Sequence, residues 1–307
     1  MQAGRGGRAG RGRGSAGRGR GSAGRGRATS DDEARKKQAL RTLLASDSSR
    51  GEVESALDVL MSNGLLKTSK EHTIAISAMA RINALEQAVN LLNQMDVYGP
   101  WPNVIHYNAA IHACDKAGAW KCALLLLNRM RENGVASDVV SFNAAISACA
   151  GSGQAAVAVT LLWEMLSLGI PPSVVTMSTV MDACARNGQW ERAVALLDQM
   201  QAFAVYPNTV SYNTAISACS KAGEWQMAVS LLHHMREAWV WPDTVGLSSA
   251  MSACGQAGEW KVALELMDFM RTSELTPDVV VYSAAITACE KGAQWETGFK
   301  LLAQMQE

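Results

Sequence analysis

The sequence lacks long hydrophobic runs, and this excludes a membrane-spanning helix. No stretch of the 307 residues approaches the roughly 18 consecutive apolar residues that such a helix needs. No apolar segment stands near the N-terminus, so a secretory signal is not expected. Cys-x-x-Cys pairs are absent from the chain. Their absence removes a frequent sequence signal of a zinc or redox site.

Acidic residues are absent from the first 27 positions, although the formal net charge of the whole chain is zero. This segment holds eight Arg and eleven Gly, which leaves 20 basic against 28 acidic residues in the remainder. Glycine at this density cannot hold a helix, so we expect residues 1–29 to be a disordered Arg-Gly-rich tail. Such a tail suits contact with RNA phosphates and bases. An organellar presequence is the alternative, although serines are few and large apolar residues are absent.

A period of 35 residues runs through the rest of the chain. It divides residues 69–307 into six full units and most of a seventh. The units begin at Ser69, Val104, Val139, Val174, Thr209, Thr244 and Val279. Positions are counted below from the first residue of each unit. Cysteine recurs at the eleventh position of six units: Cys114, Cys149, Cys184, Cys219, Cys254 and Cys289.

Each unit has the apolar spacing of two successive helices. In the fifth unit the spacing i, i+3, i+4, i+7 occurs at Tyr212, Ala215, Ile216 and Cys219, and again at Ala228, Leu231, Leu232 and Met235. Gly223 stands at the turn between them, where a left-handed residue is needed. Pro242 ends the second helix, and Asp243 can cap the next one. Every unit is therefore predicted to be a helical hairpin.

A single hairpin cannot bury both of its apolar faces, so the hairpins must stack. We therefore expect an all-α fold, a right-handed superhelical α-solenoid of stacked helix–turn–helix repeats over residues 69–307. Residues 30–68 also show apolar helical spacing, but out of register with the repeats. They are predicted to form a degenerate helical cap at the N-terminal end of the stack.

The recurrent cysteines and tryptophans are interpreted as packing residues. Ligands of one metal must converge on a point, whereas cysteines one repeat apart lie in successive layers. Each recurrent Trp opens a second helix beside core Ala and Leu positions, so we expect it to pack between hairpins. No histidine is joined by a Ser, Cys or carboxylate at catalytic spacing. We therefore expect no enzyme activity, no cofactor, no metal and no small-molecule substrate.

Three columns of polar residues carry more information. The fifth position is always Asn, Ser or Thr, although these are poor helix formers that compete with the backbone for hydrogen bonds. Its residues are Thr73, Asn108, Asn143, Ser178, Asn213, Ser248 and Ser283. The last position holds Asn103, Asp138, Ser173, Asn208, Asp243 and Asp278, which are also favoured helix N-caps. The thirteenth position is basic at Arg81, Lys116, Arg186, Lys221 and Lys291, which suits a phosphate chain or the helix dipole.

The 35-residue period and the run Val-Ser-Tyr-Asn-Thr-Ala-Ile-Ser-Ala-Cys-Ser-Lys-Ala-Gly at 210–223 resemble the pentatricopeptide repeat. So does Pro-Asp at 242–243. The full-length units are similar to the plain P class. The resemblance implies modular reading of single-stranded RNA, one base per repeat. The fifth and last residues of a unit would hydrogen-bond one base edge. A branched aliphatic residue at the second position would sandwich neighbouring bases. These aliphatic residues are Ile105, Val140, Val175, Val210, Val245 and Val280.

The family's code then implies a base for each full unit. Thr or Ser with Asn favours A, Asn with Asp favours U, Asn with Ser favours C, and Ser with Asp favours G. The six pairs therefore suggest a preference near 5′-AUCAUG-3′. Ser283 belongs to the seventh unit, whose last position the chain does not reach. The first unit departs from the pattern, with Lys70 at its second position.

The leading hypothesis is a non-catalytic, sequence-preferring RNA-binding protein that acts in organellar RNA processing, stability or translation, together with RNA-processing proteins. A chloroplast or mitochondrial location follows from the resemblance, with the nucleus or cytoplasm as the alternative. The competing hypothesis is a scaffold that binds a protein or peptide in its concave face. The restricted fifth position favours RNA, because a peptide groove has no reason to require it.

Overall fold

The computed structural model describes residues 23–45 and 47–306, which form sixteen α-helices and one short 3-10 helix. The chain divides into two compact units, with the boundary along the sequence between Leu66 and Lys67. In the first unit, α1 (Ala23–Leu44) packs against α2 (Arg50–Ser62) as a hairpin. None of the helices in the described part of the chain has the length and hydropathy of a membrane span.

Helix α1 corrects the expected extent of the N-terminal tail. It begins at Ala23, so residues 23–29 are helical rather than disordered. Extending an existing helix costs far less than nucleating one, and this favours continuation of α1 into the Gly-containing segment. The rest of the predicted tail, residues 1–22, lies outside the described residues.

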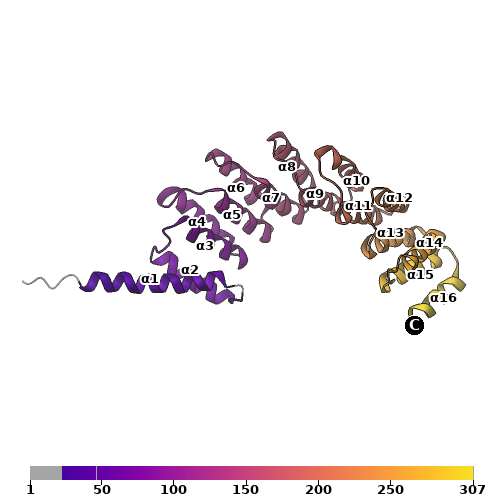
Figure 1. Ribbon diagram of the computed structural model, residues 1–307, viewed down its shortest axis with the longest axis horizontal. Helices are drawn as coiled ribbons and strands as arrows, with labels where there is room; N and C mark the ends of the chain where they lie inside the picture. Colours follow the sequence, from indigo (N-terminus) through magenta and orange to yellow (C-terminus); the bar gives the residue numbers. More distant parts are fainter. Residues whose placement is uncertain (1–22, 46, 307) are drawn as a thin grey trace, which may run out of the picture. The chain divides into compact units, whose positions relative to one another are not determined.

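The second unit contains seven consecutive helical hairpins (Figure 1). Their helices are α3 (Ser69–Arg81), α4 (Leu85–Tyr98), α5 (Val104–Lys116), α6 (Trp120–Glu132), α7 (Val139–Gly151), α8 (Ala155–Ser167), α9 (Val174–Arg186), α10 (Trp190–Gln199), α11 (Thr209–Ala222), α12 (Trp225–Glu237), α13 (Thr244–Ala257), α14 (Trp260–Thr272), α15 (Val279–Lys291) and α16 (Trp295–Gln306). The 3-10 helix η1 (Gln201–Phe203) follows α10. The prediction of an all-α solenoid of stacked hairpins is confirmed.

The hairpins stack in two layers. Each odd-numbered helix from α3 to α13 packs against the next odd-numbered one, which makes a continuous first layer from α3 to α15. Each even-numbered helix from α4 to α14 packs against the odd-numbered helix of its own hairpin and that of the following hairpin. The even-numbered helices therefore cover one side of the first layer, as the paired ribbons of Figure 1 show.

Burial follows from this arrangement. Helix α5 has neighbours on several sides and buries a broad set of residues: Tyr107, Ala110, Ile111, Ala113 and Cys114. Helix α6 packs on one side only and buries a narrower stripe: Ala123, Leu126, Leu127 and Met130. Trp225 and Trp260 pack against the buried cluster of Cys254, Ala263 and Ala288, as expected for the tryptophan column. In the last hairpin Trp295 is exposed.

Local signals set where the helices begin and end. The last residue of each full repeat caps the first helix of the following repeat; Asp138, for example, accepts a hydrogen bond from the Ser141 backbone N–H at 2.8 Å. Gly223 ends α11 in the left-handed conformation (φ 80°), as the sequence predicts. Capping by a side-chain oxygen satisfies a backbone donor that the helix itself leaves unpaired.

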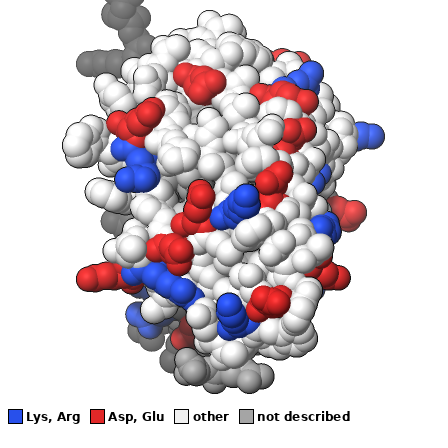
Figure 2. Space-filling model, turned by 90° about the vertical axis from the view of Figure 1, so that its right-hand side faces the viewer, with Lys and Arg blue, Asp and Glu red and all other residues white. Residues whose placement is uncertain are grey.

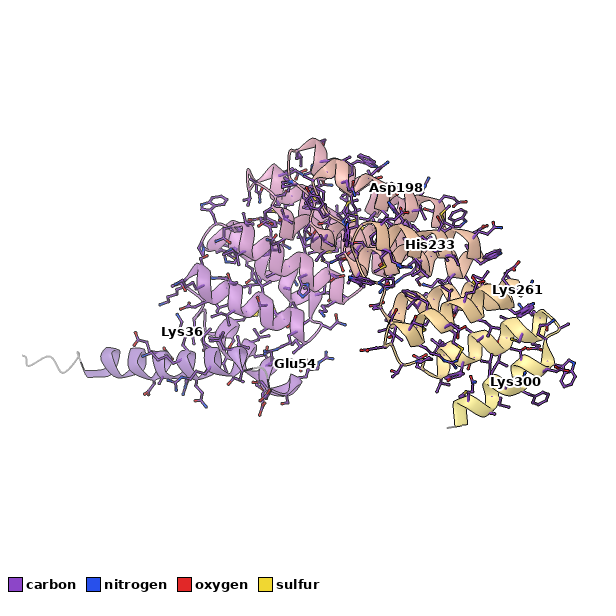
Figure 3. All side chains as sticks on the ribbon, turned by 45° about the vertical axis from the view of Figure 1, so that its right-hand side comes forward. Lys36, Glu54, Asp198, His233, Lys261 and Lys300 are labelled. Carbon is purple, nitrogen blue, oxygen red and sulfur yellow. The ribbon has the colours of Figure 1, made fainter. Side chains whose placement is uncertain are left out.

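Charged residues lie on the outer surface of the repeats. Acidic and basic side chains are intermixed across the described residues of the face in Figure 2. The even-numbered helices present Asp198, His233, Lys261 and Lys300 to solvent (Figure 3). The face in Figure 2 therefore shows mixed charge rather than one extended field of a single sign.

The eleventh-position cysteines lie buried in the first layer and show no solvent exposure. Burial raises the pKa of Cys149 and Cys254 to about 11 and that of Cys219 to about 12. Burial also raises the pKa of Cys114, with the neighbouring Cys122 adding to the shift. A thiol reacts as its thiolate, so these buried thiols are inert near neutral pH.

We therefore expect Ellman's reagent at pH 8 to react rapidly with only one of the seven cysteines of the native protein, the half-buried Cys122. All seven should react after unfolding in urea, because unfolding restores ordinary thiol pKa values. The Cys122→Ser variant is the control and should show no rapid phase. Rapid reaction of several thiols in the native protein would contradict the burial of the eleventh-position cysteines.

Candidate nucleic-acid interface

The fifth, second and last positions of the repeats gather at the N-terminal ends of the odd-numbered helices. The second and fifth positions lie in the first two turns of these helices, and the last position is the cap that precedes the next helix. The second-position aliphatics are all exposed, from 54% at Val280 to 66% at Val175. Branched apolar side chains left in water at the same place in six repeats favour a surface that contacts a ligand.

A groove in the fourth repeat brings the predicted residue types together. Its lining includes second-position Val175 and Val210, fifth-position Ser178, thirteenth-position Arg186 and last-position Asn208, together with the carboxylates of Asp115 and Asp182. Val175, Ser178 and Arg186 lie on α9. Val210 lies on α11, and Asn208 directly precedes α11. The structure thus joins groups suited to apolar contact, hydrogen bonding and anion binding on one surface.

The two Asn–Asp pairs are directly hydrogen-bonded. Asn108 Nδ2 donates to Asp138 Oδ1 at 3.1 Å, and Asn213 Nδ2 donates to Asp243 Oδ1 at 2.9 Å. Burial by itself raises the pKa of Asp138, but hydrogen bonds from Ser141, Asn108 and Val140 outweigh it and lower the pKa below its ordinary value. Asp138 therefore stays ionised at neutral pH, as a hydrogen-bond acceptor beside an amide donor.

The remaining fifth-position residues contact other groups. Asn143 Oδ1 accepts a hydrogen bond from the Thr176 hydroxyl at 2.6 Å, and the Ser178 and Ser211 hydroxyls lie 3.4 Å apart. The other hydroxyls bond to carbonyls of their own helices: Thr73 to Ser69, Ser248 to Val245 and Ser283 to Val279. The contacts with Thr176 and Ser211 come from the third position of the following repeat. The sequence pattern did not single out this third position, although a Ser or Thr recurs there in the third, fourth and fifth repeats.

The thirteenth-position cations are exposed but not equivalent. Arg186 pairs with Asp182 at 2.7 Å on the same helix. Lys291 Nζ donates to the carbonyl of Gln256 at 2.7 Å, one repeat earlier. Contact with the end of a neighbouring helix agrees with stabilisation of the helix dipole. Among the described residues, no group of three or more His, Cys, Asp or Glu could hold a metal ion.

Comparison with known families decides what these repeats are. Residues 137–186 and 172–219 match the PPR repeat family, residues 90–152 and 230–291 match the pentatricopeptide repeat domain, and residues 210–240 match the PPR repeat. These matches together extend over residues 90–291. The chain belongs to the pentatricopeptide repeat family.

Solved pentatricopeptide repeat structures share this fold. The crystal structure of PPR10 from maize is 22% identical, with a TM-score of 0.64, and the match covers 90% of this chain but 43% of PPR10. The complex of PPR10 with an 18-nt psaJ RNA element is 18% identical, with a TM-score of 0.50 over 87% of this chain and 44% of that one. The PPR domain of Arabidopsis thaliana protein-only RNase P 1 in complex with tRNA is 18% identical, with a TM-score of 0.52 over 59% of this chain and 95% of that domain. The comparison with curated protein sequences found no match.

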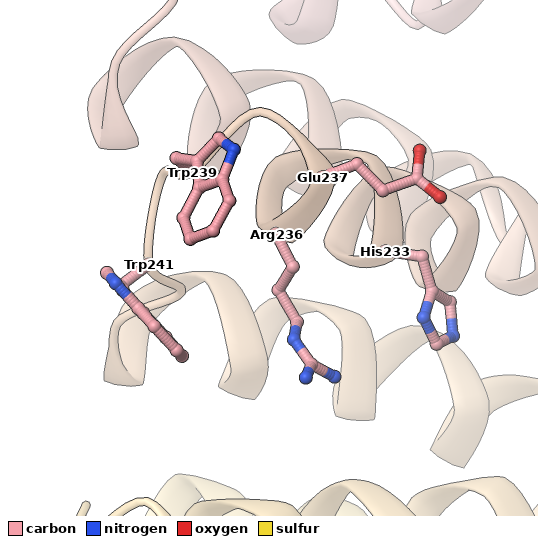
Figure 4. Close-up of a pocket in the computed structure, with 5 residues that line it drawn as sticks. All are labelled: His233, Arg236, Glu237, Trp239 and Trp241. Carbon is pink, nitrogen blue, oxygen red and sulfur yellow. The ribbon is translucent and has the colours of Figure 1, made fainter.

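One exposed aromatic cleft of this pentatricopeptide repeat protein lies apart from the predicted base-reading residues. It lies at the C-terminal end of α12, where Trp239 and Trp241 lie on one side of Arg236 (Figure 4). Trp239 is 87% exposed and has a left-handed backbone (φ 59°). Gly134 and Gly169 occupy the same position of the second and third repeats, with φ of 71° and 72°. A side chain with a Cβ is strained in this conformation.

We expect Trp239→Gly to stabilise the protein by about 0.5–1 kcal/mol, because relief of the strain exceeds the entropy cost of glycine. Little packing is lost, since the indole is mostly in solvent. The reverse change, Gly169→Ala, should lower stability by about 1 kcal/mol. No atom outside the local chain lies within 4 Å of a Cβ added at Gly169, so only the backbone opposes it. Urea unfolding of both variants measures this, and a destabilised Trp239→Gly variant would show that the indole has a stabilising contact.

Proposed function

We propose that this protein is a non-catalytic, sequence-preferring single-stranded RNA-binding protein that reads one base per repeat. The observation that carries the proposal is the groove of the fourth repeat, where Val175, Ser178, Arg186, Asn208 and Val210 lie together. An RNA base needs an apolar surface against its face, hydrogen-bonding groups at its edge and a cation near its phosphate. Membership of the pentatricopeptide repeat family and the solved RNA complex of PPR10 support the same function.

The base preference follows from the fifth and last residues of each full repeat. Thr73 with Asn103 would select A, Asn108 with Asp138 U, Asn143 with Ser173 C, Ser178 with Asn208 A, Asn213 with Asp243 U, and Ser248 with Asp278 G. The second-position aliphatics would lie between neighbouring bases. The resulting preference is near 5′-AUCAUG-3′, read from the first repeat to the sixth. Ser283 belongs to the same column in the seventh repeat.

Electrostatic attraction would come from two sources. The eight arginines of residues 1–27 hold RNA of any sequence, whereas the remaining chain has eight more acidic than basic residues. The thirteenth-position cations, Arg81, Lys116, Arg186, Lys221 and Lys291, would contact the phosphates locally. Affinity therefore depends on the N-terminal segment, and selectivity depends on the repeats.

The cellular role that fits this chemistry is the plain P-class role, in which the repeats cover a transcript site or recruit RNA-processing proteins in a chloroplast or mitochondrion. The restriction of the fifth position to Asn, Ser and Thr favours RNA over a peptide ligand. These short side chains act as donors and acceptors for base edges.

Fluorescence anisotropy with labelled 5′-AUCAUG-3′ and a scrambled hexamer tests the proposal. We expect at least about tenfold tighter binding of the first oligomer, since correct hydrogen bonding at one base contributes on the order of 1–3 kcal/mol. Equal affinities would overturn sequence-preferring binding. Repeating the titration at several salt concentrations with and without residues 1–27 separates the two contributions. Binding that disappears with the N-terminal segment at every sequence would favour the peptide scaffold instead.

A further inference from the structure

The third residue of a repeat contacts the fifth residue of the preceding repeat in the middle of the array. Ser141 Oγ donates to Asn108 Oδ1 at 2.6 Å, and Thr176 Oγ1 donates to Asn143 Oδ1 at 2.6 Å. Ser211 Oγ lies 3.4 Å from Ser178 Oγ. Ser141, Thr176 and Ser211 are almost completely buried, so these contacts lie beneath the candidate RNA-binding surface.

These contacts restrict how an asparagine can present its amide. An amide group has an acceptor end and a donor end, and a flip exchanges them. In the second repeat the Ser141 hydroxyl lies 2.6 Å from Asn108 Oδ1 and 2.9 Å from Asp138 Oδ1, so the shorter contact is the one to Asn108. Asn108 Nδ2 donates to Asp138 at 3.1 Å. Both ends are therefore assigned, and the amide offers an N–H group to a ligand. Uracil and cytosine differ in their hydrogen-bond donors and acceptors, so an amide that cannot flip discriminates between them more strictly than one that can.

The fifth repeat has the same Asn–Asp pair without this restraint, because the third residue of the next repeat is Gly246. Asn213 Nδ2 still donates to Asp243, but Asn213 Oδ1 is buried and has no hydrogen-bond partner. A Cβ added at Gly246 would lie 2.4 Å from that oxygen, so the Asn213 amide occupies the space that a serine side chain fills in other repeats. One of its two ends is therefore unrestrained.

The first and sixth repeats lack the restraint for other reasons. His106, at the third position of the second repeat, bonds the Ser69 carbonyl at 2.8 Å, and Thr73 bonds the same carbonyl within its own helix at 3.1 Å. Val281 is the third residue of the seventh repeat and has no side-chain hydroxyl. Ser248 bonds the carbonyl of Val245 in its own helix at 3.0 Å.

We propose that the third residue of each repeat is a positioning residue for the base-reading side chain of the preceding repeat. Hydroxyl residues there make the second, third and fourth repeats stricter than the first, fifth and sixth. The inference rests on the proposed function. It predicts that the central bases UCA of 5′-AUCAUG-3′ are selected more strictly than the flanking ones. It also predicts that two repeats with the same Asn–Asp pair differ in their discrimination of U from C.

The test uses the full-length protein and three labelled hexamers, AUCAUG and its U-to-C variants at base two and at base five. For the wild type, we expect the penalty for C to be about fivefold greater at base two than at base five, the usual effect of one hydrogen bond. Ser141→Ala should reduce the penalty at base two and leave base five unchanged. Gly246→Ser should raise the penalty at base five, because the opposing Asn213 side chain can move to accept the hydroxyl.

A second variant keeps the test independent of the folding of the first. Thr176→Val replaces the hydroxyl that bonds Asn143 by a methyl group of similar size. It should reduce discrimination at base three, which a fourth hexamer with U at that base measures. A merely structural role would weaken binding of all hexamers equally, so the readout is the ratio of Kd values at one base. If the wild type prefers AUCAUG but these Kd ratios are the same in Ser141→Ala, Thr176→Val and the wild type, the inference is wrong. A wild type that binds AUCAUG and a scrambled hexamer equally would instead overturn the proposed function.

Discussion

Replacing Asp138 by serine is expected to change the base preferred by the second repeat from U to C. The variant pairs Asn108 with a serine, the combination that Asn143 and Ser173 form in the third repeat. It also removes the carboxylate that accepts a hydrogen bond from Asn108 Nδ2. We expect the preference for AUCAUG over ACCAUG to reverse, with a total change of about 10- to 100-fold, corresponding to roughly 1–3 kcal/mol. Anisotropy titrations with the two hexamers measure it.

Serine is the informative replacement because Asp138 also caps α7. Its carboxylate accepts from the Ser141 backbone N–H, and Ser173 caps α9 in the same way through the N–H of Thr176. Serine therefore preserves the helix start, whereas alanine would cost about 1 kcal/mol of stability. Asp198→Ser is the matched control, because it removes the same charge from an exposed position of α10. A variant that weakens both hexamers equally would show that Asp138 is only a cap.

Phe142→Ala is expected to destabilise the protein by about 3–5 kcal/mol, the usual loss when a buried aromatic leaves a cavity. Phe142 has no solvent exposure and lies on α7, which packs against α5, α6, α8 and α9. Neighbouring repeats supply much of each other's stability, so the loss should affect cooperativity across the middle of the array. Urea unfolding followed by circular dichroism measures it. A loss below about 1 kcal/mol would contradict the close packing at this position.

Val140→Ala is the matched change two residues earlier on the same helix. Val140 is 57% exposed, so we expect its replacement to alter stability by less than about 0.5 kcal/mol. Its loss should instead weaken binding of AUCAUG by about 1 kcal/mol, or roughly fivefold in Kd, because less apolar surface contacts the bases. Together the two variants separate the residue that stabilises the fold from the residue predicted to contact RNA. Loss of stability without loss of affinity in Val140→Ala would reverse that assignment.

The hairpins could be predicted from the sequence because their determinants are local. Capping of α7 by Asp138, the left-handed turn at Gly223 and the apolar spacing from Tyr212 to Cys219 involve residues close along the chain. The 35-residue period then repeats those determinants in register. The tail was harder to delimit. Residues 23–29 are Gly-containing and polar, but they continue α1, because the existing helix outweighs their weak local preference.

The sequence by itself determined the all-α repeat architecture and the columns of candidate RNA-binding residues, since a regular helix register places the second, fifth and last positions alike in every repeat. Only the tertiary structure decided how residues of the same type at the same repeat position differ in their contacts. Asn108 and Asn213 belong to the same Asn–Asp pair type, yet Ser141 restrains the Asn108 amide, whereas Gly246 leaves the buried Oδ1 of Asn213 without a hydrogen-bond partner. Such contacts join residues 33 positions apart in the chain. They depend on the separation of packed helices and on the shape of each side chain, which spacing along the sequence does not contain.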